Sequence, residues 1–203
     1  MIPPDGPLSQ WVTGFVGTVP IFDDVMSLFA TGFFIPVAMA LILLSLWFSA
    51  KEPEQRRRDQ ITMLAAATAF GFANWALWII NKNIGFNPWP HPFDVYASAD
   101  IAANMLLHHT TDPSFPSHGA AIFFALATGV WLGNRKKTGA VLYALATLWC
   151  LARFYCGVHY LSDIAAGAAI GVVIAYITSK YFFAAVAPLV RWILRTLERF
   201  YLA

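Results

Sequence analysis

The sequence has few charged residues and few cysteines, and both shortages restrict what the chain can be. Only 12% of its 203 residues are charged, which is about half the charged fraction of an average soluble domain. The net charge is +2, so a nucleic-acid partner is not expected, and the run Arg56–Arg58 fits a role in membrane orientation better. Cys150 and Cys156 match neither a CxxC pair nor a zinc site, so we interpret both as packing residues.

Long apolar stretches are what the chain has in abundance, since 59% of its residues are hydrophobic. Each stretch has roughly 17–26 residues, enough for a helix to cross a hydrocarbon core. The start lacks the basic region of a cleaved signal peptide, so none is expected. We predict an all-α, polytopic membrane helix bundle formed by residues 1–203 as a single domain, with about five transmembrane helices near 25–50, 60–81, 117–133, 138–157 and 160–180.

Both ends of the chain have amphipathic patterns. Residues 7–20 place Trp11 and Phe15 at helical spacing, which predicts a helix lying at the membrane interface. Residues 184–202 include Arg191, Arg195 and Arg199, each four apart, with apolar residues between them. This pattern predicts a basic amphipathic helix on a membrane surface.

The basic residues predict the orientation of the spans. They lie in residues 51–58, in residues 135–137 and from residue 180 onward. Threading five spans alternately through the membrane puts these three segments on one side, and the positive-inside rule assigns that side to the cytoplasm. The outer side then receives the N-terminus, the loop 82–116 and the short loop around 157–160.

The polar residues that interrupt the apolar pattern gather on this outer side. A charged side chain within a membrane span costs about 2.5–3.5 kcal/mol on insertion scales, so it usually has a partner or a function. Each residue alone could be an interfacial anchor, but the whole group at one membrane face indicates a site. Its members are Lys82, Ser117, His118, Arg153, His159 and Asp163.

The spacing of these residues suits phosphate chemistry. His159 and Asp163 are four apart and share a helix face, so the carboxylate can fix the imidazole tautomer and make the other ring nitrogen more nucleophilic. Arg153 offers a planar fork of donors and Lys82 a point charge. Ser117 begins a span whose backbone N–H groups can bind an anion. No aspartate cluster suits Mg²⁺, so we expect no metal or other cofactor.

At this point the sequence resembles a known family. ARFYCGVHYLSDIAAG (152–167) resembles the third motif of the type-2 phosphatidic acid phosphatase superfamily, Arg-x5-His-x3-Asp. SFPSHGA (114–120) resembles the second motif, Pro-Ser-Gly-His, and KNIGFNPWP (82–90) resembles the first, Lys-x6-Arg-Pro. Over roughly residues 8–180 the chain looks most like the bacterial undecaprenyl-diphosphatase branch.

The resemblance implies a membrane lipid phosphatase that hydrolyses an isoprenoid diphosphate, or a related lipid phosphate, at the outer leaflet of the bacterial cytoplasmic membrane. Its site would face the periplasm or the cell exterior. By this resemblance His159 attacks phosphorus to form a phosphohistidine, and Asp163 orients it. Phosphate oxygens are held by Lys82, Ser117 and Arg153, and the candidate general acid is His118.

Two motifs depart from the family pattern. Trp89 stands at the arginine position of the first motif, and His91 lies where the branch often has a second arginine, so we predict that His91 binds substrate. In the second motif the order is His118-Gly119, and an ungapped alignment puts Gly119 at the place of the acid. Gly119 is therefore predicted to lie at the substrate. His118 is one residue away from the acid position, and on a helix one residue turns the direction of a side chain by about 100°.

Other interpretations remain open at this stage. A catalytically impaired relative could act as a lipid-binding protein or as a membrane subunit of a larger complex. A transporter is less favoured, because no charged residue lies at mid-span and no paired broken helices are evident. The membrane spans disfavour a vanadium haloperoxidase. His91, His108, His109 and His118 could suggest a metal site, but they lack HxxxH or HExxH spacing.

Overall fold

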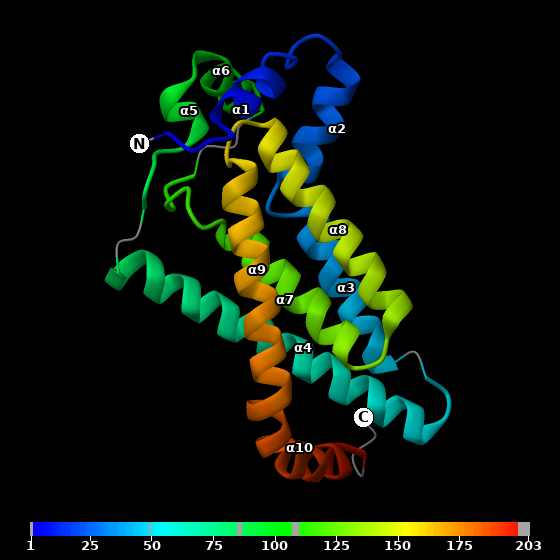
Figure 1. Ribbon diagram of the computed structural model, residues 1–203. Coiled ribbons are helices and arrows are strands. Elements are labelled where there is room, and N and C mark those ends of the chain that lie inside the picture. Colours follow the sequence, from blue (N-terminus) through cyan, green and yellow to red (C-terminus); the bar gives the residue numbers. More distant parts are fainter. Residues whose placement is uncertain (1, 49, 85–86, 107–109, 199–203) are drawn as a thin grey trace.

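The computed structural model describes residues 2–48, 50–84, 87–106 and 110–198, and in these residues the secondary structure is helical, without strands. Figure 1 shows an elongated bundle, with the N-terminus and several short helices at one end and the C-terminal helix at the other. The elements, in chain order, are α1 (Gly6–Thr13), α2 (Pro20–Ala30), α3 (Phe34–Phe48), α4 (Pro53–Ile79), the π-helical turn η1 (Ile80–Ile84), α5 (Pro92–Val95), α6 (Ala97–Leu106), α7 (His118–Leu132), α8 (Lys136–Tyr155), α9 (Leu161–Ile177), the π-helical turn η2 (Thr178–Phe182) and α10 (Phe183–Glu198).

Fewer helices than expected have the length of a membrane span. Among the described residues three qualify, Pro53–Lys82, Lys136–Tyr155 and Leu161–Thr196, and α2 with α3 makes a fourth if the pair, bent by 51°, is one span. Helix α7 is apolar but has only 15 residues, about 22 Å of helix, which is less than a hydrocarbon core. The membrane-bundle class is thus confirmed, and the count of five spans is not.

The bend between α2 and α3 has a local cause. Pro36 lies in the first turn of α3, and this is the part of a helix where a residue without an N–H is tolerated. A helix therefore has to begin shortly before Pro36, and α3 begins at Phe34 after the break at residues 31–33. The apolar content of residues 25–50 predicted one span and gave no sign of this break.

Helix α7 lies at the centre of the bundle, against α4, α8 and α9. Its contact with α9 depends on two glycines four residues apart. A Cβ on Gly167 would lie 2.3 Å from the carbonyl oxygen of Ser117, and one on Gly171 would lie 2.1 Å from that of Ala121. Such small residues let helix backbones approach closely in membranes. The approach places the first turn of α7 directly beside the first turns of α9.

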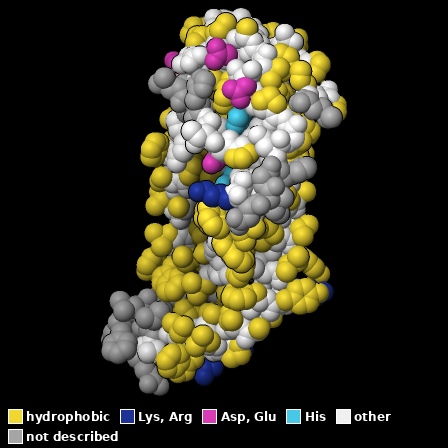
Figure 2. Space-filling view, turned by 90° about the vertical axis from the view of Figure 1, so that its left-hand side faces the viewer, with side chains coloured by type: hydrophobic (Ala, Val, Ile, Leu, Met, Phe, Trp, Pro, Cys, Tyr) yellow, Lys and Arg dark blue, Asp and Glu magenta, His cyan; other side chains and the backbone are white. Residues whose placement is uncertain are grey.

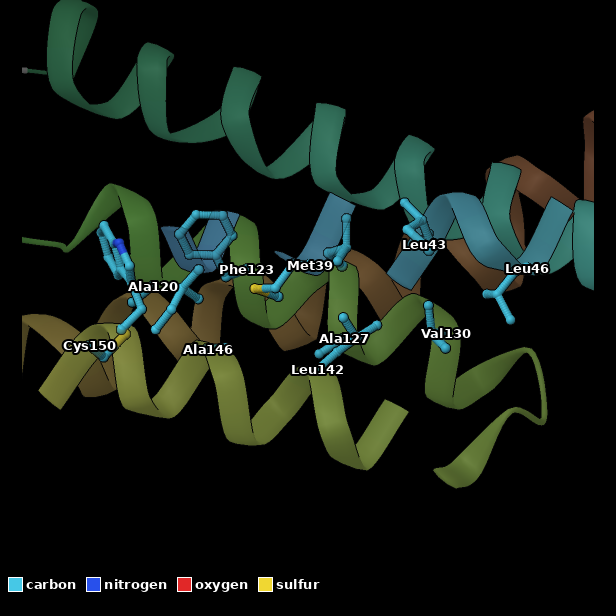
Figure 3. Close-up of a cluster of buried hydrophobic side chains, with 14 residues drawn as sticks. Met39, Leu43, Leu46, Ala120, Phe123, Ala127, Val130, Leu142, Ala146 and Cys150 are labelled. Carbon is cyan, nitrogen blue, oxygen red and sulfur yellow. The ribbon is translucent and has the colours of Figure 1, made fainter. Parts of the chain in front are cut away.

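The opposite face of α7 packs into the main apolar core. Figure 3 shows Met39 of α3 pointing toward Ala127 of α7, with Leu142 and Ala146 of α8 closing the cluster. These side chains are almost fully buried. They fix α7 between α3 and α8, and so they fix the position of the outer end of α7.

The end of the bundle predicted to face outward, where the N-terminus lies, is covered by α1, α5 and α6 (Figure 1). The turn from α8 to α9 passes beneath this cover at Gly157, whose φ of +72° suits glycine. The carboxylate of Asp5 accepts hydrogen bonds from the Ser162 N–H (2.7 Å) and hydroxyl (2.9 Å), which ties the N-terminal segment to α9. The interfacial helix expected over residues 7–20 is shorter than predicted, because α1 ends at Thr13.

The other end of the bundle gathers the basic segments. Asp59, near the start of α4, is 1% exposed and pairs with Arg135, just before α8. Thr62 donates to the Gly133 carbonyl oxygen at 3.2 Å in the same region. Helix α10 runs across this end (Figure 1) and exposes Trp192. Its place on a membrane surface stays a prediction. Residue 199, the last arginine of the predicted amphipathic pattern, lies outside the described residues.

The sidedness can be tested with single cysteines. Both native cysteines are buried, whereas Lys137 and Ala97 are exposed at opposite ends of the bundle. We expect a membrane-impermeant maleimide to label Ala97→Cys in intact cells and to label Lys137→Cys only after the membrane is permeabilised. Labelling of Lys137→Cys from outside would reverse the orientation.

Candidate functional site

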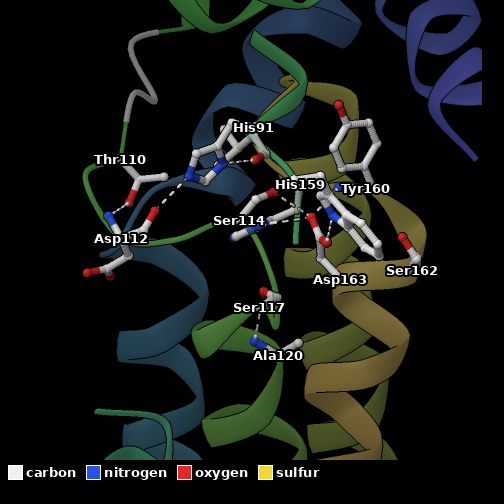
Figure 4. Close-up of polar contacts among 12 residues, drawn as sticks. His91, Thr110, Asp112, Ser114, Ser117, Ala120, His159, Tyr160, Ser162 and Asp163 are labelled. Atoms are coloured by element: carbon white, nitrogen blue, oxygen red, sulfur yellow. Dashed lines mark hydrogen bonds and ion pairs between the residues drawn. The ribbon is translucent and has the colours of Figure 1, made fainter. Parts of the chain in front are cut away.

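The polar cluster at the outer end is organised around the carboxylate of Asp163, in the first turn of α9. This side chain is fully buried. Its Oδ1 accepts from Trp89 Nε1 at 2.9 Å, and its Oδ2 accepts from the Ser114 hydroxyl at 2.7 Å and the Tyr160 N–H at 2.9 Å (Figure 4). Because Tyr160 is the N-cap of α9, Asp163 also caps its own helix. Three donors on separate segments thus hold one charge in place.

His159 lies beside this carboxylate, in the short segment between α8 and α9. Its Nδ1 is 3.7 Å from Asp163 Oδ2, which is longer than a hydrogen bond, and this nitrogen is buried without a partner among the described residues. Burial lowers the pKa of the imidazole, and nearby His91 and Arg153 lower it further, whereas Asp163 opposes the shift. A neutral ring with Nδ1 turned to a carboxylate presents Nε2 as its nucleophilic atom.

Arg153 brings a positive charge to the same region from the last turn of α8. Its guanidinium carbon lies 4.7 Å from the centre of the Trp149 ring, and its Nε is buried without a hydrogen-bond partner among the described residues. A buried donor without a partner is costly. A bound anion with several acceptor oxygens would satisfy it, and the planar fork suits phosphate.

Ser117 is the N-cap of α7 and is fully buried. Its hydroxyl accepts from the Ala120 N–H at 3.4 Å, and its own N–H donates to the Asp163 carbonyl oxygen at 3.1 Å. The start of α7 is therefore fastened to the start of α9. N–H groups in the first turn of a helix have no partner within the helix and attract anions, so this turn is a second suitable place for phosphate oxygens.

The first turn of α7 also places His118 and Gly119. His118 Nε2 lies 3.0 Å from Asn74 Oδ1 of α4, so the ring is turned toward α4. A Cβ on Gly119 would lie 2.1 Å from the Trp149 ring, so the space beside residue 119 is filled by Trp149. The expected place of Gly119 at the substrate can involve only its backbone, and an imidazole at this turn can come only from His118.

His91 is held between two backbone carbonyl groups. Its Nδ1 lies 2.6 Å from the Val158 oxygen and its Nε2 lies 2.6 Å from the Asp112 oxygen (Figure 4). A neutral imidazole has one N–H, so both contacts are hydrogen bonds only when the ring is protonated. Neither nitrogen is free for a substrate oxygen here. His91 instead joins the segment that carries His159 to the loop before α7. The centres of the His91 and His159 rings are 5.7 Å apart.

Lys82 lies in η1 with its side chain exposed. Among the described residues no hydrogen bond or ion pair joins it to Arg153 or His159. On the face seen in Figure 2 the visible acidic and histidine side chains lie in the upper half, next to a basic group, above a largely hydrophobic surface. The described residues contain no group of three His, Cys, Asp or Glu placed to hold a metal ion, and His108 and His109 lie outside them.

Three polar groups of the site were not expected from the sequence. Ser114 lies three residues before Ser117 in SFPSHGA, and Asn74 lies inside an apolar span, where a lone amide is an unusual residue. Trp89 stands at the arginine position of the first motif, and the sequence gives no sign of its contact with Asp163. The first two could have been suspected from their positions, whereas the partner of Trp89 depends on the path of the loop.

Comparison with known sequences gives the family. The sequence model described as "PAP2 superfamily" matches residues 29–187. The chain is 42% identical over 72 residues to the "Bacitracin transport permease protein BcrC" of Bacillus licheniformis, covering 36% of this chain and 35% of the relative. It is 44% identical over 69 residues to the "Putative undecaprenyl-diphosphatase YbjG" of Escherichia coli (strain K12), covering 33% and 34%. The matched segment thus spans about a third of each relative.

The fold also has a solved counterpart. A PAP2-type phosphatidylglycerolphosphate phosphatase from Bacillus subtilis aligns with a TM-score of 0.51, over 86% of this chain and 84% of that one. The sequence identity of 17% limits this likeness to the fold. It confirms the PAP2-type transmembrane helix bundle as the fold of this chain.

Proposed function

The chain belongs to the PAP2 superfamily, and from this membership we propose that it is a membrane lipid phosphatase that acts through a phosphohistidine on His159. The observation that supports this most directly is the group at the starts of α7 and α9. A buried imidazole with Nδ1 facing Asp163 lies near a buried arginine donor that has no partner among the described residues. This combination provides a nucleophile and a charged donor for a phosphoryl group.

In the proposed reaction, His159 Nε2 attacks the terminal phosphorus. The bond between phosphorus and the bridging oxygen breaks, and its electron pair leaves with the lipid. Water then attacks the phosphohistidine, which releases inorganic phosphate and returns the free imidazole. Arg153 and the first turn of α7 offset the charge that builds on the non-bridging oxygens.

We propose a lipid diphosphate of the isoprenoid class as the substrate. One of the two relatives described above is named an undecaprenyl-diphosphatase, and a diphosphate tolerates a displaced general acid. Its leaving group is a lipid phosphate, which needs little protonation, whereas a lipid monophosphate must release an alkoxide. His118 faces Asn74. It is therefore less well placed to act as an acid than the histidine of an unaltered second motif.

The site faces the outer leaflet in this proposal. It lies at the end of the bundle opposite the basic segments, and basic segments favour the cytoplasm. The bacterial cytoplasmic membrane is therefore the proposed location, with substrate reaching the site from the periplasm or the cell exterior.

The first test is phosphate release from purified protein with a chelator present. We expect turnover of a polyprenyl diphosphate without added metal, and no turnover above background for His159→Ala. Burial lowers the pKa of His159, so its ring stays neutral to a lower pH than an exposed histidine ring does. The acid limb of kcat/KM should therefore lie below about pH 6.5. Substantial activity in His159→Ala would reject the covalent route.

The role of His118 needs two leaving groups. If it protonates the leaving oxygen, His118→Ala should lower turnover of a lipid monophosphate by about 10²–10⁴-fold and turnover of the diphosphate by much less. Asn74→Ala is the matched control, since it removes the partner of His118 and keeps the imidazole. Equal losses on both substrates in His118→Ala would exclude His118 as the acid. Absence of turnover on every lipid phosphate would favour an impaired, lipid-binding relative.

A further inference from the structure

We infer that Trp89 is a positioning residue, whose indole N–H holds the Asp163 carboxylate in the orientation that faces His159. The catalytic part of this inference rests on the proposed function, but the contact and its effect on His159 do not. Trp89 stands where the resemblance implies an arginine. In place of the phosphate contact that an arginine would make, Trp89 contacts the Asp163 carboxylate, which in turn faces His159.

Trp89 contacts a different oxygen of the carboxylate from the one that the other two donors contact. It donates to Oδ1 at 2.9 Å, whereas Ser114 and the Tyr160 N–H both donate to Oδ2. Oδ2 is also the oxygen closest to His159, at 3.7 Å from Nδ1. The Trp89 hydrogen bond is therefore the contact that fixes the far oxygen of the carboxylate.

Holding the far oxygen matters because the terminal torsion of an aspartate is broad. With Oδ1 fixed, rotation of the carboxylate about its last bond is restricted, and Oδ2 keeps its direction toward His159. The indole ring is itself fixed by an edge-to-face contact with Phe115, with ring centres 5.0 Å apart. Phe115 adjoins Ser114, so the loop before α7 supports Oδ1 through the Trp89 ring and Oδ2 through the Ser114 hydroxyl.

The neutrality of the indole has a chemical consequence. A guanidinium at this position would pair with Asp163 and offset much of its charge. An indole N–H orients the carboxylate and leaves the negative charge largely in place, where it can stabilise the imidazolium form of His159. Among the described residues, the titratable and charged groups that face His159 are Asp163 from α9, Arg153 from α8 and His91 from the segment before α5.

The direction of the expected effect follows. Without the indole N–H, Ser114 and the Tyr160 N–H still hold Oδ2 beside His159, but fewer donors offset the charge of the carboxylate. The imidazolium is then stabilised more, and the pKa of His159 rises. The nucleophile is the neutral ring, so the acid limb of kcat/KM moves to higher pH. A residue that only fills space would leave this titration unchanged.

The test uses Trp89→Phe, which keeps an aromatic ring against Phe115 and removes only the indole donor. Trp131→Phe, at the cytoplasmic end of α7, is the matched control for losing an indole. The titration of His159 is followed by NMR of histidine-labelled protein without substrate, and the signal is assigned with His159→Gln. We expect the midpoint to rise by about 0.5–1 pH unit in Trp89→Phe and to stay unchanged in Trp131→Phe.

Kinetics on the same proteins test the catalytic part. In Trp89→Phe kcat should fall roughly tenfold because the carboxylate is less well oriented, with KM little changed. Trp89→Arg restores a donor and adds a charge, so it should move the His159 midpoint below that of the unchanged protein. This variant decides the question if Trp89→Phe does not fold.

The two proposals fail in different ways. A His159 titration in Trp89→Phe that superimposes on that of the unchanged protein would overturn the positioning role. A shifted titration in a protein without turnover on any lipid phosphate would support the positioning role and refute the proposed function.

Discussion

The hydrogen bonds to the buried carboxylate of Asp163 are the interactions on which the arrangement of the site depends. A carboxylate removed from water is costly unless it is hydrogen-bonded and balanced by nearby positive charge. Its donors come from the loop before α5, the loop before α7 and the start of α9. Satisfying one charge therefore sets the relative positions of three segments, and the same arrangement turns one carboxylate oxygen toward His159.

The helix bundle provides the rigid frame for this arrangement. Gly167 and Gly171 let α7 approach α9, and the apolar core against α3 and α8 fixes the other face of α7. The hydrogen bond from the Ser117 N–H to the Asp163 carbonyl oxygen joins the two helices where the site begins. The site thus sits on helix ends held by packing, and the segments before α5 and α7 add Trp89, His91 and Ser114 to it.

Part of this structure follows directly from the sequence. The spacing of Arg153, His159 and Asp163 predicts a cluster, because it joins the end of one helix to the first turn of the next. The basic segments, predicted on one side, lie at one end of the bundle, and the side of the membrane that this end faces stays a prediction. The contacts of Trp89 and His91 could not be predicted in this way. The Trp89–Asp163 and His91–Val158 contacts join residues 74 and 67 positions apart, so these partners depend on how the segment 87–96 folds back. The bend between α2 and α3 was missed because apolar content does not reveal a break.

Trapping of the covalent intermediate tests the central claim most directly. The account predicts that rapid quenching of the protein during turnover of a lipid diphosphate, under conditions that preserve phosphohistidine, leaves a phosphoryl group on the peptide that contains His159. The same adduct should be missing in His159→Gln. A phosphoryl group on another residue, or turnover without any adduct when its breakdown is rate-limiting, would contradict the account.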